Sequence, residues 1–180
     1  MNRLPAGNVS KGMNQKRDQI GTGAPHSARG RSARLMLRVL TVVALAVDAY
    51  VHLHLAPTFD PIRATVSEGQ LFRLEAAAAV VAGLLLLVVD NRISWLLAVL
   101  VLAAGAAAVL FYQYVDVGAI GPLPDMYDAY WSGLKVASLV AEGVGAVLAA
   151  VGLRHSLRAD TGNEKWRRSS AVDDGHGRSA

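Results

Sequence analysis

Five ionisable residues lie inside long apolar stretches of this chain, where each charge costs several kcal/mol unless it finds a partner or water. These residues are Asp48, His52, Glu75, Lys135 and Glu142. Carboxylates and an imidazole can exchange protons or bind cations, whereas a lysine can neutralise acids or bind an anionic group. The five positions therefore predict a polar site among otherwise apolar helices.

Spacing along the chain predicts which of these side chains share a helix face. His52 follows Asp48 by one helical turn, or about 6 Å along the axis. Lys135 and Glu142 are seven residues apart, which also places them on one face. Glu75 enters from the outer end of its apolar stretch at a depth similar to that of His52, so we expect all five side chains to converge. The pocket would open toward the outer leaflet, bordered by His54, Tyr112, Tyr114 and Ser138.

Two interpretations of this cluster remain open at the level of sequence. In the first, the acids and Lys135 neutralise one another and act as hydrogen-bonding links between helices. In the second, the cluster is a small-molecule or proton site, where Lys135 holds an anionic or quinone-like headgroup and His52 exchanges protons near neutral pH. Both interpretations require the same helices to meet.

A metal ion is a further alternative for the same residues. Asp48, His52 and Glu75 supply the ligand types of a three-ligand site, although their spacing matches no known metal-binding signature. We expect no haem, because His52 and His54 point to roughly opposite sides of one helix and cannot ligate one haem from both faces. The chain contains no cysteine, which excludes disulfides and thiolate metal sites. We expect no bound cofactor.

The elements that must position these residues are four long apolar runs. The chain has 180 residues, of which 53% are hydrophobic, and each run is about long enough to cross a bilayer as a helix. We place the spans at about 36–56, 70–89, 93–114 and 130–153. The predicted fold is all-α, a four-helix transmembrane bundle over 36–153. It is flanked by a disordered basic cytoplasmic tail at 1–35 and a disordered cytoplasmic tail at 154–180.

Charge predicts the orientation of the bundle. Residues 1–38 carry eight Lys or Arg against one acid, whereas the loop at 115–129 carries three Asp and no Lys or Arg. Basic residues favour the cytoplasmic side, so both termini are expected inside and both longer loops outside. The sequence thus predicts a multi-pass protein of the plasma (inner) membrane. The formal charge of +4 is explained by this orientation, and we expect no nucleic-acid partner.

A faint internal repeat relates the two halves of the bundle. An offset of 60 residues places His54 on Tyr114 and Glu75 on Lys135. Such a repeat predicts two parallel helical hairpins, related by an axis along the membrane normal. Small residues spaced by four, at Ala79 and Gly83 and at Gly145 and Ala149, let helices approach closely in lipid. They do not indicate which helices touch.

Three segments carry a resemblance to a known group of proteins. They are Asp48-Ala49-Tyr50-Val51-His52-Leu53 running into Leu55-Ala56-Pro57, then Gly69-Gln70-Leu71-Phe72-Arg73-Leu74-Glu75, then Asp116-Val117-Gly118-Ala119-Ile120-Gly121-Pro122-Leu123-Pro124-Asp125-Met126-Tyr127 followed by Lys135 and Glu142. Here the chain resembles small four-span membrane proteins of unknown function found mainly in actinobacteria. The outline also resembles the DoxX-type membrane proteins. The resemblance implies a compact helical inner-membrane protein and transfers no activity.

The functional hypothesis is a non-enzymatic membrane protein, because the chain holds no recognised catalytic signature. It would be an accessory or small-ligand-binding four-helix bundle, with the lipid bilayer and either a membrane protein or a second copy of itself as partners. One alternative is a membrane oxidoreductase component that acts with quinone or metal through Asp48, His52, Glu75 and Lys135. Another is a small oligomeric transporter.

Overall fold

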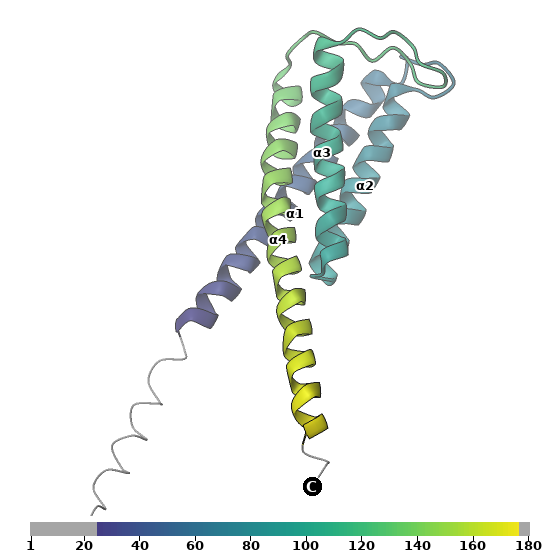
Figure 1. The fold of residues 1–180 in the computed structure, drawn as a ribbon. Helices are drawn as coiled ribbons and strands as arrows, with labels where there is room; N and C mark the ends of the chain where they lie inside the picture. The colour runs from purple at the N-terminus through teal and green to yellow at the C-terminus, as the bar shows by residue number, and fades with distance from the viewer. Residues whose placement is uncertain (1–24, 177–180) are drawn as a thin grey trace, which may run out of the picture. The chain divides into compact units, whose positions relative to one another are not determined.

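The computed structural model describes residues 25–176, with side chains described from 30 to 158. It contains four helices in this range: α1 at Pro25–Phe59, α2 at Glu68–Val88, α3 at Arg92–Tyr114 and α4 at Gly133–His176 (Figure 1). The chain divides into two compact units, residues 1–36 and 37–180, and the bundle belongs to the second. The predicted all-α fold is confirmed.

All four helices contain a segment that is long and apolar enough to cross a membrane. These segments are Gly30–Phe59, Glu68–Val88, Arg92–Tyr114 and Gly133–Arg158. Large apolar side chains such as Val80, Leu84, Leu100, Val140 and Val147 are exposed on them. Extended apolar surface of this kind is unusual on a water-soluble monomer and is typical of a surface that faces lipid. The chain therefore has the features of a multi-pass membrane protein.

Helical structure extends beyond the predicted spans at both ends of the bundle. α1 already begins at Pro25 and α4 continues to His176, so both helices include residues that the sequence analysis assigned to the tails. Apolar runs mark the part of a helix that lies in lipid, whereas a helix that is already nucleated continues through polar residues at little cost. The disorder predicted for residues 1–24 and 177–180 lies outside the described residues.

Side-chain caps define where α2 and α3 begin. The Ser67 hydroxyl accepts a hydrogen bond from the Gln70 N–H, and the Gln70 side chain accepts one from the Ser67 N–H. Asn91 and Ser94 form the same reciprocal arrangement before α3. Each cap satisfies backbone donors that the first turn leaves unpaired. The tight turn between α2 and α3 is thereby stabilised by hydrogen bonds between residues that are close in the chain.

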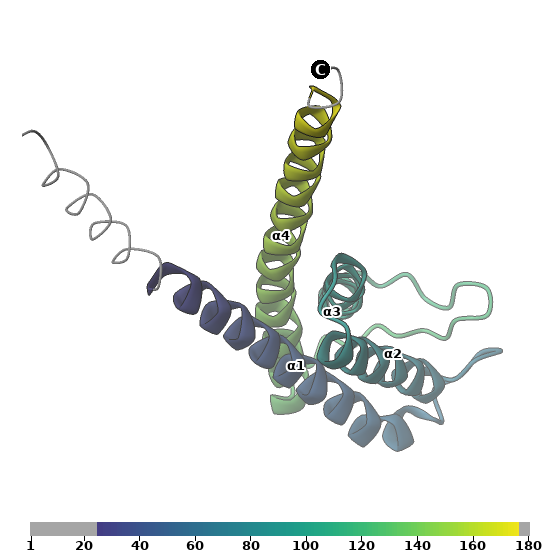
Figure 2. The same ribbon diagram turned by 90° about the horizontal axis from the view of Figure 1, so that it is seen from below.

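Small residues allow the helices of the second unit to approach closely. Figure 2 shows the part of α1 from Leu37 onward beside α2, with α3 on the other side of α2. A Cβ atom on Gly145 of α4 would lie 2.7 Å from Ala44 Cβ on α1 and 2.9 Å from Leu102 Cδ1 on α3. A Cβ on Gly152 would overlap the ring of Trp95, which is fully buried. Both glycines are therefore needed for the contacts of α4.

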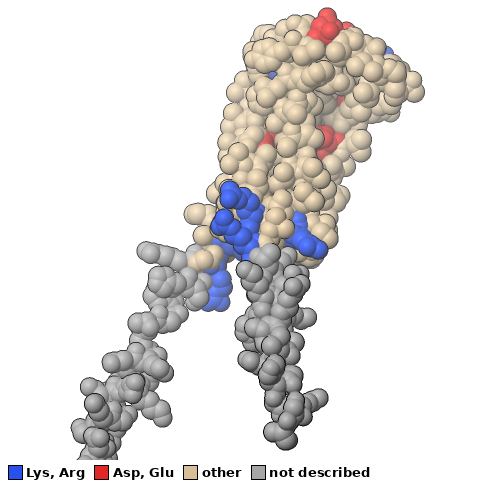
Figure 3. Space-filling view, in the orientation of Figure 1, with Lys and Arg blue, Asp and Glu red and all other residues tan. Residues whose placement is uncertain are grey.

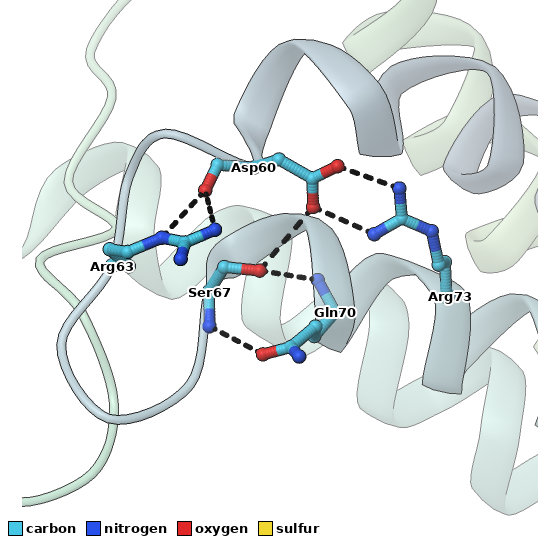
Figure 4. Close-up of polar contacts among 5 residues, drawn as sticks. All are labelled: Asp60, Arg63, Ser67, Gln70 and Arg73. Carbon is cyan, nitrogen blue, oxygen red and sulfur yellow. Dashed lines mark hydrogen bonds and ion pairs between the residues drawn. The ribbon is translucent and has the colours of Figure 1, made fainter.

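The two long loops meet at the end of the bundle opposite the α2–α3 turn (Figure 1). The Val66 N–H donates a hydrogen bond of 3.0 Å to the Pro122 carbonyl, which joins the first loop to the second. Asp60 organises the first loop, because its carboxylate accepts two hydrogen bonds of 2.7 Å from Arg73 and its carbonyl accepts two from Arg63 (Figure 4). Those Arg73 hydrogen bonds hold the pKa of the Asp60 carboxyl below its usual value.

Candidate functional site

Three ionisable side chains from two helices meet inside the bundle. Asp48 and His52 come from α1 and Glu142 comes from α4. Each offers one atom that could bind a metal, a ring nitrogen or a carboxylate oxygen, and these three atoms lie within 4.8 Å of one another. Asp48 and Glu142 are fully buried and His52 is 8% exposed. We call these three residues the buried cluster.

The contact between Asp48 and His52 follows from their predicted spacing of one helical turn. His52 Nδ1 lies 2.7 Å from Asp48 Oδ1 and 3.0 Å from the Asp48 carbonyl oxygen. The contact with the carbonyl has the alignment of a hydrogen bond, whereas the contact with Oδ1 has only the distance of an ion pair. The edge of the Phe72 ring packs against the imidazole, with ring centroids 5.2 Å apart. The imidazole is thus held from both α1 and α2.

Glu142 reaches the buried cluster because α3 has a glycine beside it. The Ser138 hydroxyl donates a hydrogen bond of 2.8 Å to Glu142 Oε1. A Cβ atom on Gly105 would lie 3.0 Å from Glu142 Cδ and 3.1 Å from Oε1, which is closer than side chains normally pack. Gly105 therefore leaves the space that the carboxylate occupies.

Several carboxylate oxygens of the site are buried without a hydrogen bond from any described residue. These are both oxygens of Asp48, Oε2 of Glu142 and Oε1 of Glu75. Glu75 is half-buried on α2 and interacts electrostatically with Asp48 and His52, so it lies beside the buried cluster. Buried oxygens are normally satisfied, and each exception calls for an explanation. The arrangement offers more acceptor oxygens than Ser138 and His52, its two donors, can satisfy.

Lys135 does not join the acids as the sequence analysis expected. Its Nζ lies 2.8 Å from Asp128 Oδ2, 2.6 Å from the Asp128 carbonyl oxygen and 3.1 Å from Gln113 Oε1. Lys135 stands in the first turn of α4, where the long side chain reaches the loop more easily than the bundle interior. Partial burial raises the pKa of the Asp128 carboxyl, but hydrogen bonds from Lys135 and the Tyr130 N–H outweigh this and lower it overall.

The remaining predicted residues divide between the cluster and the surface. Ser138 lies in the cluster, whereas His54 stacks on Tyr50 with ring centroids 5.8 Å apart and Tyr114 is exposed. Tyr112 is half-buried against Phe111. The three-residue group that could hold a metal contains Glu142 in place of the predicted Glu75.

Sequence reasoning missed Gly105, Gln113 and Asp128 as residues that shape the site. Gly105 lies in a run of small residues that carried no positional signal, and Asp128 lies in the 115–129 loop, where no contact with Lys135 was expected. Gln113 offered a usable signal, since it is a polar residue inside an apolar span and such residues normally have a partner. Its amide bridges Lys135 and the Ala129 carbonyl.

Comparison with known proteins does not supply a function. No family model, curated protein or solved structure matches the chain. The resemblance to actinobacterial four-span proteins therefore stays a prediction. What the site can do must be argued from its geometry.

Proposed function

We propose that this chain is a multi-pass protein of the plasma membrane with both termini in the cytoplasm. Four basic residues support this orientation because they belong to the end of the bundle that holds the α2–α3 turn. They are Arg38, which donates to the Leu87 carbonyl, Arg92, which begins α3, and Arg154 and Arg158 on α4. Figure 3 shows Lys and Arg gathered at one end of the bundle and an acidic patch at the other. Basic residues favour the cytoplasmic side.

The function that the geometry supports best is the binding of a small cation within the bundle, by a non-enzymatic accessory or binding protein. The observation that supports this function is that Asp48, Glu75 and Glu142 have buried carboxylate oxygens that accept no hydrogen bond. Three carboxylates face one imidazole there, and the nearest expected cation, Lys135, is engaged by Asp128. A buried excess of negative charge is costly unless a cation or protons neutralise it.

The quinone alternative loses its main support for the same reason. A quinone or an anionic headgroup presents acceptor oxygens and needs donors from the protein. Most polar atoms of the buried cluster are acceptors, one ring nitrogen of His52 already contacts Asp48, and the donor expected for that role, Lys135, already binds Asp128 and Gln113. A cation is the complementary ligand.

Thermal melting of the purified protein in detergent tests this proposal. The ligands are protons, Na⁺, K⁺, Mg²⁺, Ca²⁺, Zn²⁺ and Mn²⁺, each added to wild type and to the double variant Asp48→Asn/Glu142→Gln. At a hundred times its dissociation constant, a ligand that binds the folded state adds about 2.7 kcal/mol. For a domain of this size that is a shift of about 5 °C or more.

We expect at least one of these cations to raise the melting temperature of wild type and to lose this effect in the double variant. Asp116→Asn is the matched control, because it also removes a carboxylate but lies in an exposed loop. The proposal fails if none of the ligands stabilises wild type, or if the double variant responds as wild type does.

A further inference from the structure

We infer that the cation is a divalent first-row transition metal ion, bound by Asp48, His52 and Glu142. The inference rests on the proposed function and names the class of its ligand. It differs from the metal site considered from sequence, because the third ligand comes from α4 and not from α2. A metal there would connect the first and the last helix of the bundle.

The donor set favours this class of ion. One imidazole nitrogen and two carboxylate groups combine a borderline donor with hard donors. Na⁺, K⁺, Mg²⁺ and Ca²⁺ prefer sites built entirely from oxygen, whereas imidazole suits the divalent transition metals. The chain has no cysteine, so thiolate sites for softer ions are absent.

The distances are close to those that a single ion requires. Imidazole nitrogen and carboxylate oxygen bind zinc at about 2.0 to 2.2 Å, so two ligand atoms of one tetrahedral ion lie about 3.3 to 3.6 Å apart. The three donor atoms of the buried cluster already lie within 4.8 Å of one another. Side-chain movements of about 1 Å bring all three to the separations of a tetrahedral site.

Charge balance selects a divalent ion over a monovalent one. With a neutral His52, ionised Asp48 and Glu142 carry two negative charges, which a divalent cation offsets, and an ionised Glu75 adds a third. A monovalent cation leaves one negative charge fully buried, and a buried unpaired charge is costly. Glu75, half-buried beside the cluster, then stands as an additional carboxylate close to the ion.

The surroundings orient the ligands as metal sites require. The Asp48 carbonyl engages one ring nitrogen of His52, and the Ser138 hydroxyl engages one oxygen of Glu142. Metal-bound histidines and carboxylates are commonly oriented by a second partner of this kind. The cluster oxygens without a hydrogen bond, both of Asp48 and Oε2 of Glu142, are the ones left for an ion.

Metal titration of the full-length protein tests the inference. Protein purified in detergent is stripped with a chelator and titrated with Zn²⁺, Mn²⁺ and Co²⁺, with stoichiometry measured by elemental analysis and affinity by calorimetry. The Co²⁺ form adds a visible absorption spectrum that reports a nitrogen and oxygen ligand set. We expect about one ion per chain.

The chain offers a matched pair of histidines as variant and control. His52→Ala should weaken metal binding at least tenfold and abolish the Co²⁺ spectrum, whereas His54→Ala, two residues away and stacked on Tyr50, should change neither. Circular dichroism and size-exclusion chromatography check that each variant remains folded. If His52→Ala does not fold, His52→Gln and Glu142→Gln provide the same comparison.

The outcomes separate this inference from the proposed function. If Na⁺, K⁺, Mg²⁺, Ca²⁺ or protons stabilise wild type through Asp48 and Glu142 while Zn²⁺, Mn²⁺ and Co²⁺ do not bind, the metal inference is overturned and the proposed function stands. If all ligands fail, both are overturned. Metal binding that is equally strong in wild type and in the folded His52 variant also overturns the inference.

Discussion

At the scale of single residues, Glu142 shows how the bundle accommodates a buried acid. Its carboxylate has one donor, Ser138, and lies against the backbone of Gly105, where any larger residue would crowd it. The space for the charge is therefore made by α3, although α3 contributes no ionisable side chain to the buried cluster. From sequence alone, Gly105 predicts only close packing between helices.

Gly105→Ala should lower the stability of the bundle by about 1 to 3 kcal/mol, because the added methyl group displaces the Glu142 carboxylate. Thermal melting in detergent measures the loss. Combining the change with Glu142→Ala should remove most of the clash, so the losses of the two single variants should not add. Additive losses would mean that the methyl group meets something other than Glu142.

A second residue-scale prediction concerns Lys135, which connects α4 to the loop that precedes it. Lys135→Met and Asp128→Asn should each destabilise the protein, and the double variant should lose less than their sum, with a coupling of about 0.5 to 1 kcal/mol because the Asp128 side chain is 40% exposed. Lys135→Met with Glu142→Gln serves as the control and should be additive. Coupling to Glu142 in place of Asp128 would contradict the structure.

At the scale of elements, the first loop is stabilised in part by the ion pair between Asp60 and Arg73. The pKa of Asp60 is lowered in the folded state, so its contribution to stability is present above the usual aspartate pKa of about 3.9 and is lost as the pH falls through the lower folded value. Asp60→Asn should therefore melt earlier than wild type at pH 6, and this difference should shrink as the pH falls below the usual aspartate pKa. A difference that stays constant over this range would exclude the ion pair as its cause.

The elements also show what sequence can predict in such a protein. Hydropathy located all four spans, and spacing alone predicted that Asp48 and His52 would meet, because both features depend only on residues close in the chain. Whether Glu142 contacts Asp48 and His52 depends on the rotation of α4 relative to α1. Contacts between the helices, such as that of Gly145 with Ala44, determine this rotation. The partner of Lys135 depends on the path of a loop. Neither could be derived from a helical period.

At the scale of the whole molecule, the polar and apolar residues are distributed as a bilayer requires. The bundle places Asp48, Glu142 and Thr41 in its interior and leaves large apolar side chains outside. Its loop end carries exposed acids such as Asp116 and Asp125, whereas Arg92 and Arg154 belong to the other end. The positive end is expected to face the cytoplasm, since translocation of basic flanks is disfavoured.

The absence of native cysteine allows this orientation to be tested with single introduced thiols. Thr65→Cys and Asp125→Cys, both exposed in the outer loops, should react with a membrane-impermeant maleimide in intact cells. Ala33→Cys and His155→Cys, exposed on the basic flanks, should react only after the cells are opened. Labelling after detergent treatment checks that all four thiols are reactive. The reverse pattern in intact cells would place the termini outside, because an impermeant reagent reaches only thiols on the outer face of the membrane.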